Sequence, residues 1–166
     1  PGLEVGLRSL PGTFFAIEGD QEAYPAAEEL VKALGGKMLS IPTEMKPVYH
    51  AAACVACNYL ASLMDLALKM YEPLGIPVDQ AMEALSPLVD ATLKNIKEMG
   101  TEKALTGPIA RGDVSTISAH IDKIEDLLPG FLPLYKNLGI YTAGLAVRKG
   151  TLQKEEYEAM KILLGG

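Results

Sequence analysis

The chain has 166 residues, of which 49% are hydrophobic and 22% are charged, and its formal net charge is −6. This length fits about one globular domain with a sizeable core. The acidic balance argues against a nucleic-acid partner, because that affinity comes largely from Lys and Arg side chains that neutralise phosphates. The only two cysteines lie three residues apart and indicate no disulfide framework, so we expect a cytoplasmic protein.

The N-terminal residues show neither an initiator Met nor the basic-then-apolar pattern of a signal peptide. We therefore expect a fragment of a longer chain. Residues 47–64 carry no charge and reach the length of a membrane span. Because His50, Asn58 and Ser62 interrupt this stretch, we predict the central helix of a soluble bundle and no membrane partner.

The first 43 residues have the pattern of a βαβ unit. Residues 13–18 are rich in β-branched and aromatic side chains, residues 21–34 have helical spacing, and residues 37–41 predict a second strand. Parallel strands need a larger sheet than 43 residues can supply. We predict that residues 1–43 are the last unit of an α/β domain.

Residues 44–166 predict an all-α bundle of about five or six helices. One helix begins near Pro47 and ends near Tyr71, and a helical region from Asp79 to Met99 is interrupted near Pro87 and stopped at Gly100. The remaining predicted helices are residues 114–127, capped by Asp113, residues 131–148, and a last helix capped by Thr151. The predicted fold class is mainly α.

A polar stripe marks the first of these helices. Lys46, His50, Cys54 and Asn58 recur every four residues and therefore share one side of the helix. Such a stripe either satisfies partners in the core or lines a cleft. His50, as an acid or base, and Asn58, as a hydrogen-bonding group, fit a carbonyl or imine site.

Cys54 and Cys57 have the spacing of a redox or metal motif, but they lie inside a helix rather than at its N-terminus. Together with His50 and His120 they could supply the four ligands of a tetrahedral zinc site, but only if the fold brings His120 close to the helix that carries the other three. Small buried side chains are the simpler interpretation, and we predict no metal.

The segment from Thr106 to Asp113 predicts an irregular loop. Gly107 and Gly112 free its backbone, Arg111 offers a bidentate donor, and a helix begins at Asp113. The loop either binds a carboxylate or phosphate or simply turns the chain. His120 lies two helical turns after Asp113 and either faces the same cleft or is solvated. The chain has no Gly-rich phosphate-binding motif for a dinucleotide or nucleoside triphosphate.

In residues 49–60 and 104–113, and again in residues 11–20, the sequence resembles a family of predicted oxidoreductases. Members carry an N-terminal Rossmann-like NADP-binding domain and a helical C-terminal domain of unknown function. The family is similar in layout to ketopantoate reductase, pyrroline-5-carboxylate reductase, the deazaflavin-dependent NADP reductases, and the 6-phosphogluconate and β-hydroxyacid dehydrogenases. In the ketopantoate reductase branch, a Lys and two Asn residues occupy the places of His50, Cys54 and Asn58, and only Asn58 keeps the residue type.

The resemblance implies that residues 1–43 are the remnant of a Rossmann-like domain. Residues 44–166 are then a substrate-binding and dimerisation domain resembling the C-terminal domain of 6-phosphogluconate dehydrogenase. It further implies a homodimer, a small carbonyl or imine substrate, and NADP bound mainly by the missing N-terminal domain. We expect catalytic roles for His50 and Asn58 and substrate contacts from Thr106, Gly107, Arg111, Gly112 and His120. The alternative is a non-catalytic dinucleotide-sensing or dimerising scaffold of the same fold.

Overall fold

The computed structural model describes residues 2–166, which form two compact units. The first unit ends at Ser62 and the second begins at Leu63, within one long helix. The predicted boundary between residues 43 and 44 lies within the short 3₁₀ turn Thr43–Met45, and a division into domains at this point stays a prediction. Each unit is described by itself below.

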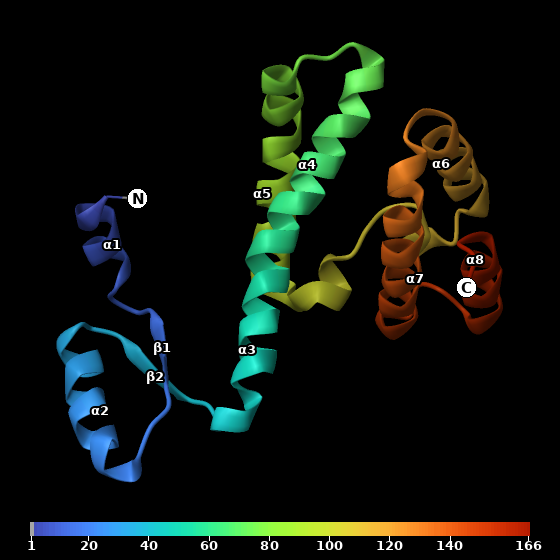
Figure 1. Cartoon of the computed structure of the whole chain (residues 1–166). Helices are drawn as coiled ribbons and strands as arrows, with labels where there is room; N and C mark the ends of the chain where they lie inside the picture. The colour runs from blue at the N-terminus through green and yellow to red at the C-terminus, as the bar shows by residue number, and fades with distance from the viewer. Residues whose placement is uncertain (1) are drawn as a thin grey trace. The chain divides into compact units, whose positions relative to one another are not determined.

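The first unit contains a two-stranded parallel sheet with its crossover helix (Figure 1). Its elements are α1 (Leu3–Ser9), β1 (Phe14–Ile17), α2 (Tyr24–Ala33) and β2 (Lys37–Ser40). The register pairs Phe14 with Lys37 and Ile17 with Ser40, so both strands end together. The predicted βαβ unit and the mainly α fold class are confirmed.

A tight fit fixes the turn between α2 and β2. At Gly36, a Cβ atom would lie 2.4 Å from the Phe15 ring, so only glycine lets the chain enter β2 at this distance from β1. Val31 of α2 is 4% exposed and is the buried residue of this helix. The helix therefore packs on the sheet through a narrow apolar stripe, as in other βαβ units.

The long helix after the sheet changes its winding in the middle. It consists of α3 (Lys46–Ala53), a π-helical segment (Cys54–Tyr59) and α4 (Leu60–Tyr71). The helical stretch Thr43–Leu74 is long and apolar enough to cross a membrane by length and composition, and only 6% of its most apolar window is buried within the chain. The exclusion of a membrane partner stays a prediction based on His50, Asn58 and Ser62.

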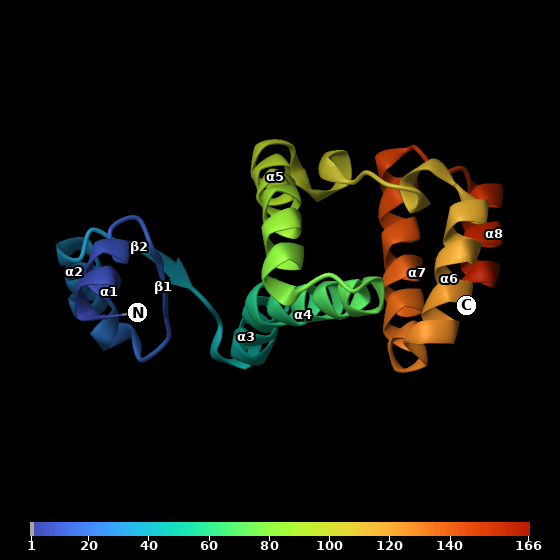
Figure 2. The same cartoon turned by 90° about the horizontal axis from the view of Figure 1, so that it is seen from above.

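The second unit is helical. After α4 it contains α5 (Val78–Ala104), α6 (Val114–Leu127), α7 (Leu132–Lys149) and α8 (Lys154–Leu163). The last three lie side by side in both views (Figures 1 and 2). Ala143 and Ala146 of α7 are fully buried, and their small side chains let α6 and α8 approach closely. Met160 and Leu164 from the C-terminal segment complete this core.

Two details of the predicted helices were wrong. Helix α5 continues through Pro87, because this residue is exposed and the Glu83 carbonyl that loses its partner can bond to water. Helix α8 is capped by Gln153 rather than Thr151, because Gln153 and Glu156 form a reciprocal capping box. The predicted break at Gly100 is confirmed by its non-helical backbone, with φ of 81°.

Candidate functional site

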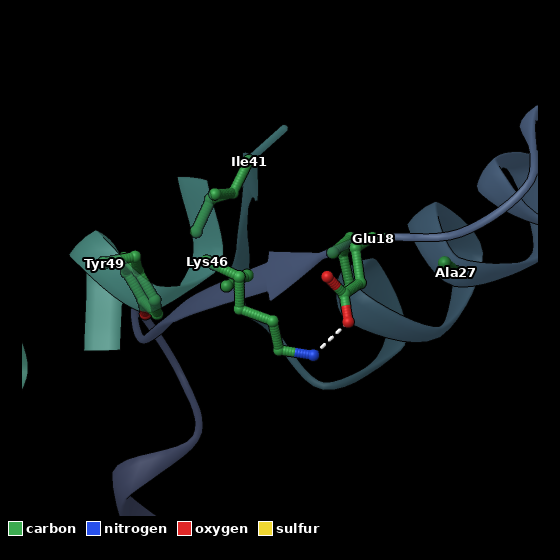
Figure 3. Close-up of a pocket in the computed structure, with 7 residues that line it drawn as sticks. Glu18, Ala27, Ile41, Lys46 and Tyr49 are labelled. Carbon is green, nitrogen blue, oxygen red and sulfur yellow. Dashed lines mark hydrogen bonds and ion pairs between the residues drawn. The ribbon is translucent and has the colours of Figure 1, made fainter. Parts of the chain in front are cut away.

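A cavity of about 310 Å³ opens at the carboxyl ends of the two parallel strands (Figure 3). This edge is where open α/β sheets bind their ligands, because the loops that follow the strands diverge there. Strand β1 ends next to the cavity, α2 contributes a small side chain, and α3 begins at its rim. The lining residues are Ala16, Ile17, Glu18, Ala27, Ile41, Lys46 and Tyr49.

An ion pair between Glu18 and Lys46 crosses this cavity (Figure 3). Lys46 is the first residue of α3, and Tyr49 lies about one turn further along the same helix. The side chains of Lys46 and Glu18 are 62% and 35% exposed, so water screens the pair and it holds the strand end to α3 only weakly. The floor is otherwise apolar, which leaves two opposite charges and a phenol as its polar groups.

The sequence analysis missed Glu18 and Tyr49 as site residues. A usable signal existed for Glu18, because it is the last residue of a predicted strand and therefore lies at the ligand-binding edge of a parallel sheet. Lys46 belonged to the polar stripe, but nothing local indicated that it would meet a residue 28 positions earlier in the chain. That contact depends on the crossover of the βαβ unit.

The π-helical segment lies within the polar stripe. Its wider turn rotates the chain by less per residue than an α-helix does, which offsets the drift of the stripe between Cys54 and Asn58. His50 and Asn58 are exposed, and Cys54 is half-buried. π-Helical turns inside α-helices are frequent at functional sites, so this segment adds to the case for the stripe.

Cys54 and Cys57 are both free thiols, and Cys57 is exposed, so the expectation of small buried side chains is wrong for Cys57. Within residues 2–166, no group of three or more His, Cys, Asp and Glu side chains is arranged to hold a metal ion. The structure thus offers no support for the zinc set of His50, Cys54, Cys57 and His120.

The loop from Thr106 to Gly112 turns back on itself. The amides of Arg111 and Asp113 both donate to the Pro108 carbonyl, at 3.1 and 3.0 Å, and the Gly112 amide donates to Ile109. These donors are therefore engaged inside the loop, and the guanidinium of Arg111 remains as its exposed cationic group. Of the two predicted anion-binding features of this loop, the amides and the Arg, the geometry favours the second.

Gly107 and Gly112 have φ angles of 98° and 67°, a region that favours glycine. A Cβ at Gly112 would also lie 3.1 Å from Leu152 Cδ1, so this position packs against the segment before α8. Asp113 then caps the N-terminus of α6. Hydrogen bonds from the Thr116 hydroxyl and amide, with one from the Ser115 hydroxyl, lower the pKa of Asp113 to about 2.

His120 lies at a second cavity, of about 410 Å³, between the end of α4 and helices α6 and α7. Its Nδ1 atom is 2.8 Å from the Tyr135 hydroxyl, and burial raises the pKa of this phenol. No residue of the loop from Thr106 to Asp113 is among those that line this cavity. The predicted site residues therefore fall into separate groups: His50 and Asn58 in the first unit, and the loop and His120 at different places in the second.

A family model for a domain of unknown function, DUF2520, matches residues 13–142. The chain belongs to the DUF2520 family. This match covers the βαβ unit, the polar stripe, the loop from Thr106 to Gly112 and most of α7. No curated protein matches the chain.

Two solved structures place the DUF2520 chain among known folds. Protein TM1727 of Thermotoga maritima is similar with a TM-score of 0.78 and 28% identity, over 89% of this chain and 58% of that one. The putative NADP oxidoreductase BF3122 of Bacteroides fragilis is similar with a TM-score of 0.65 and 24% identity, over 78% of this chain and 49% of that one. The chain thus spans about half the length of these structures.

Proposed function

We propose that this chain is the substrate-binding and dimerisation part of an NADP-dependent oxidoreductase that acts on a small carbonyl or imine compound. The observation that carries the proposal is the cavity at the carboxyl ends of β1 and β2. The polar stripe begins at this cavity, because Lys46 is both a lining residue and the first residue of α3. The fold shared with the putative NADP oxidoreductase BF3122 supports the same class of reaction.

NADP does not fit the described part of the sheet. The connection from β1 to α2 carries acidic Glu18, Asp20 and Glu22 and a single glycine, Gly19, where dinucleotide phosphates need a glycine-rich turn and amide donors. Acidic side chains there would repel the pyrophosphate. We therefore place NADP binding on a part of the protein outside this chain and assign this chain to the substrate.

Within the substrate site, His50 donates a proton to the substrate oxygen or nitrogen. Its imidazole is exposed on the same side of the long helix as Lys46, and a histidine side chain can act as a general acid. Asn58 hydrogen-bonds the substrate from the same stripe. In the second unit, the exposed guanidinium of Arg111 and the loop that carries it are a separate proposed binding group for an anion.

Dimerisation covers apolar side chains that the second unit leaves exposed. Several large apolar side chains of α4 and α5 are exposed, and exposed apolar side chains that lie together are typical of interaction surfaces. They are Leu63, Val78, Met82, Leu88, Leu93 and Met99. A second copy of the chain is the proposed cover. Sedimentation equilibrium of the full chain gives a dimer mass under this proposal, and a monomer at all concentrations contradicts it.

Calorimetric titration of NADPH and NADH into the complete protein tests the cofactor assignment, with this chain alone as the control. We expect binding only by the complete protein. A screen of carbonyl and imine compounds then identifies turnover, and His50→Ala should lower kcat/KM by more than about tenfold. Asn137→Ala, at an exposed asparagine of α7, is the matched control for Asn58→Ala, because both side chains are exposed on helices. NADPH binding without turnover across the panel favours the non-catalytic scaffold instead.

A further inference from the structure

The cavity at the ends of β1 and β2 is small and carries one group of each charge. Its volume of about 310 Å³ is near the lower end of the range for ligand cavities. Ala16, Ile17, Ala27 and Ile41 supply apolar walls, and Glu18 and Lys46 are its ionic groups. The local charge therefore sums to zero, which does not select for a simple anion or a simple cation.

The energetics of the ion pair decide which ligand fits best. A monoanion that binds Lys46 must separate it from Glu18 and then leaves a carboxylate next to the ligand's own charge. A zwitterion replaces one ion pair by two, because its carboxylate binds the Lys46 ammonium while its nitrogen binds the Glu18 carboxylate. Opening the original pair costs little, since exposed ion pairs contribute little to stability.

We propose that this cavity binds a small zwitterion with an apolar side chain, an α-amino acid or the corresponding imino acid. Its carboxylate pairs with Lys46, its nitrogen pairs with Glu18, and its side chain contacts Ile17 and Ile41. The inference rests on the proposed function, because it narrows the carbonyl or imine substrate to a nitrogen compound that also carries a carboxylate. Tyr49 at the rim adds a hydroxyl that can donate to the same carboxylate.

The test is NMR titration of the full chain with three probes that differ only in charge. L-Valine carries both groups, 3-methylbutanoate lacks the nitrogen, and 2-methylpropylamine lacks the carboxylate. We expect valine to shift the amide signals of residues 16–18, 46, 48 and 49 and to bind about tenfold more tightly than either other probe. Equal affinity for 3-methylbutanoate and valine overturns the proposal in favour of an anion site, and no binding of valine overturns it outright.

Two variants test which charged group of the ligand binds Glu18 and which binds Lys46. Glu18→Gln and Lys46→Met should each weaken valine binding about tenfold, and Glu18→Gln should leave 3-methylbutanoate unweakened. Lys32→Met is the matched control, because Lys32 forms an exposed ion pair with Glu28 at 2.8 Å in the same unit but does not line the cavity. An equal loss with Lys32→Met overturns the assignment. Circular dichroism confirms that each variant is folded.

The result of the valine test can be told apart from the result of the NADPH test of the proposed function. Valine binding in a protein whose complete form binds no NADPH retains the amino-acid site and removes the oxidoreductase. NADPH binding and turnover of a compound that lacks nitrogen retains the oxidoreductase and removes the zwitterion site.

Discussion

The imidazole of His120 and the phenol of Tyr135 join α6 to α7, with Nδ1 2.8 Å from the hydroxyl oxygen and the two rings edge to face. Both side chains line the cavity between the end of α4 and helices α6 and α7, and the other residues that line this cavity are mostly apolar. His120 is exposed and Tyr135 is half-buried, so water shields this hydrogen bond only in part. The hydrogen bond orients the histidine that the sequence analysis assigned to substrate binding.

Tyr135→Phe tests this pair. The change removes the hydroxyl and keeps the ring, so we expect the free energy of unfolding to fall by about 0.5–1.5 kcal/mol. Urea denaturation followed by circular dichroism measures it. Tyr141→Phe is the matched control, since Tyr141 lies on the same helix and is 71% exposed. An equal effect of the two substitutions contradicts the role of the His120 hydrogen bond.

Two glycines of α7 offer a comparison of close packing with open space. A Cβ at Gly139 would lie 2.9 Å from Leu164 Cδ2, whereas at Gly144 the nearest atom is Arg148 Nη1 at 4.0 Å. Both alanine variants gain helix propensity, about 1 kcal/mol each. Gly144→Ala should therefore stabilise the chain, while Gly139→Ala loses about 1–3 kcal/mol relative to it through overpacking against a buried leucine.

Thermal unfolding of the two glycine variants measures this difference. Gly144→Ala should raise the midpoint and Gly139→Ala should give a lower midpoint than Gly144→Ala. Equal midpoints mean that Leu164 can move aside, and the close fit between α7 and the C-terminal segment is then not a constraint.

Features that depend on neighbouring residues could be predicted from the sequence. Helix α6 begins at Val114 and ends at Leu127 as expected, because the Asp113 side chain caps it through Thr116, three residues away. The break at Gly100 follows in the same way from the residue type, since glycine adopts positive φ readily.

Features that depend on the tertiary fold could not be predicted from the sequence. The contact of Glu18 with Lys46 joins residues 28 positions apart, and the partner of His120 comes from the next helix. The π-helical turn at Cys54 also escaped prediction, because a shift of the hydrogen-bonding pattern by one residue hardly alters the spacing of apolar side chains. The sequence therefore offers candidate residues one at a time, and the contacts between distant residues come only from the fold.

Substitution of Met160 tests how much the core of the second unit contributes to the free energy of unfolding. Its side chain is fully buried against α6 and α7, while Ile162 two residues later is 73% exposed. Met160→Ala should lower the free energy of unfolding by about 2–5 kcal/mol, because it removes buried atoms and leaves a cavity. Ile162→Ala should change it far less. Urea denaturation of both variants measures the contrast, and similar losses contradict the assignment of the core.

The carboxyl group of Asp113 predicts a dependence of stability on acid pH. Its pKa is lowered from an ordinary 3.8 to about 2, first by the Thr116 hydroxyl, then by the Thr116 amide and the Ser115 hydroxyl. A lowered pKa means that the folded state binds its proton less tightly than the unfolded state. The stabilising contribution is therefore complete above pH 3.8 and is lost as the pH falls toward 2.

Carboxyl NMR titration of Asp113 in the full chain measures this pKa directly. Thr116→Val removes the largest cause and should raise the pKa toward 3.8 while the chain stays folded at neutral pH. The difference in unfolding free energy between the native chain and Asp113→Asn should be largest above pH 4 and should shrink below it. Asp122→Asn, at an exposed position within the same helix, serves as the control. A difference that stays constant across this range means that the Asp113 charge does not stabilise the start of α6.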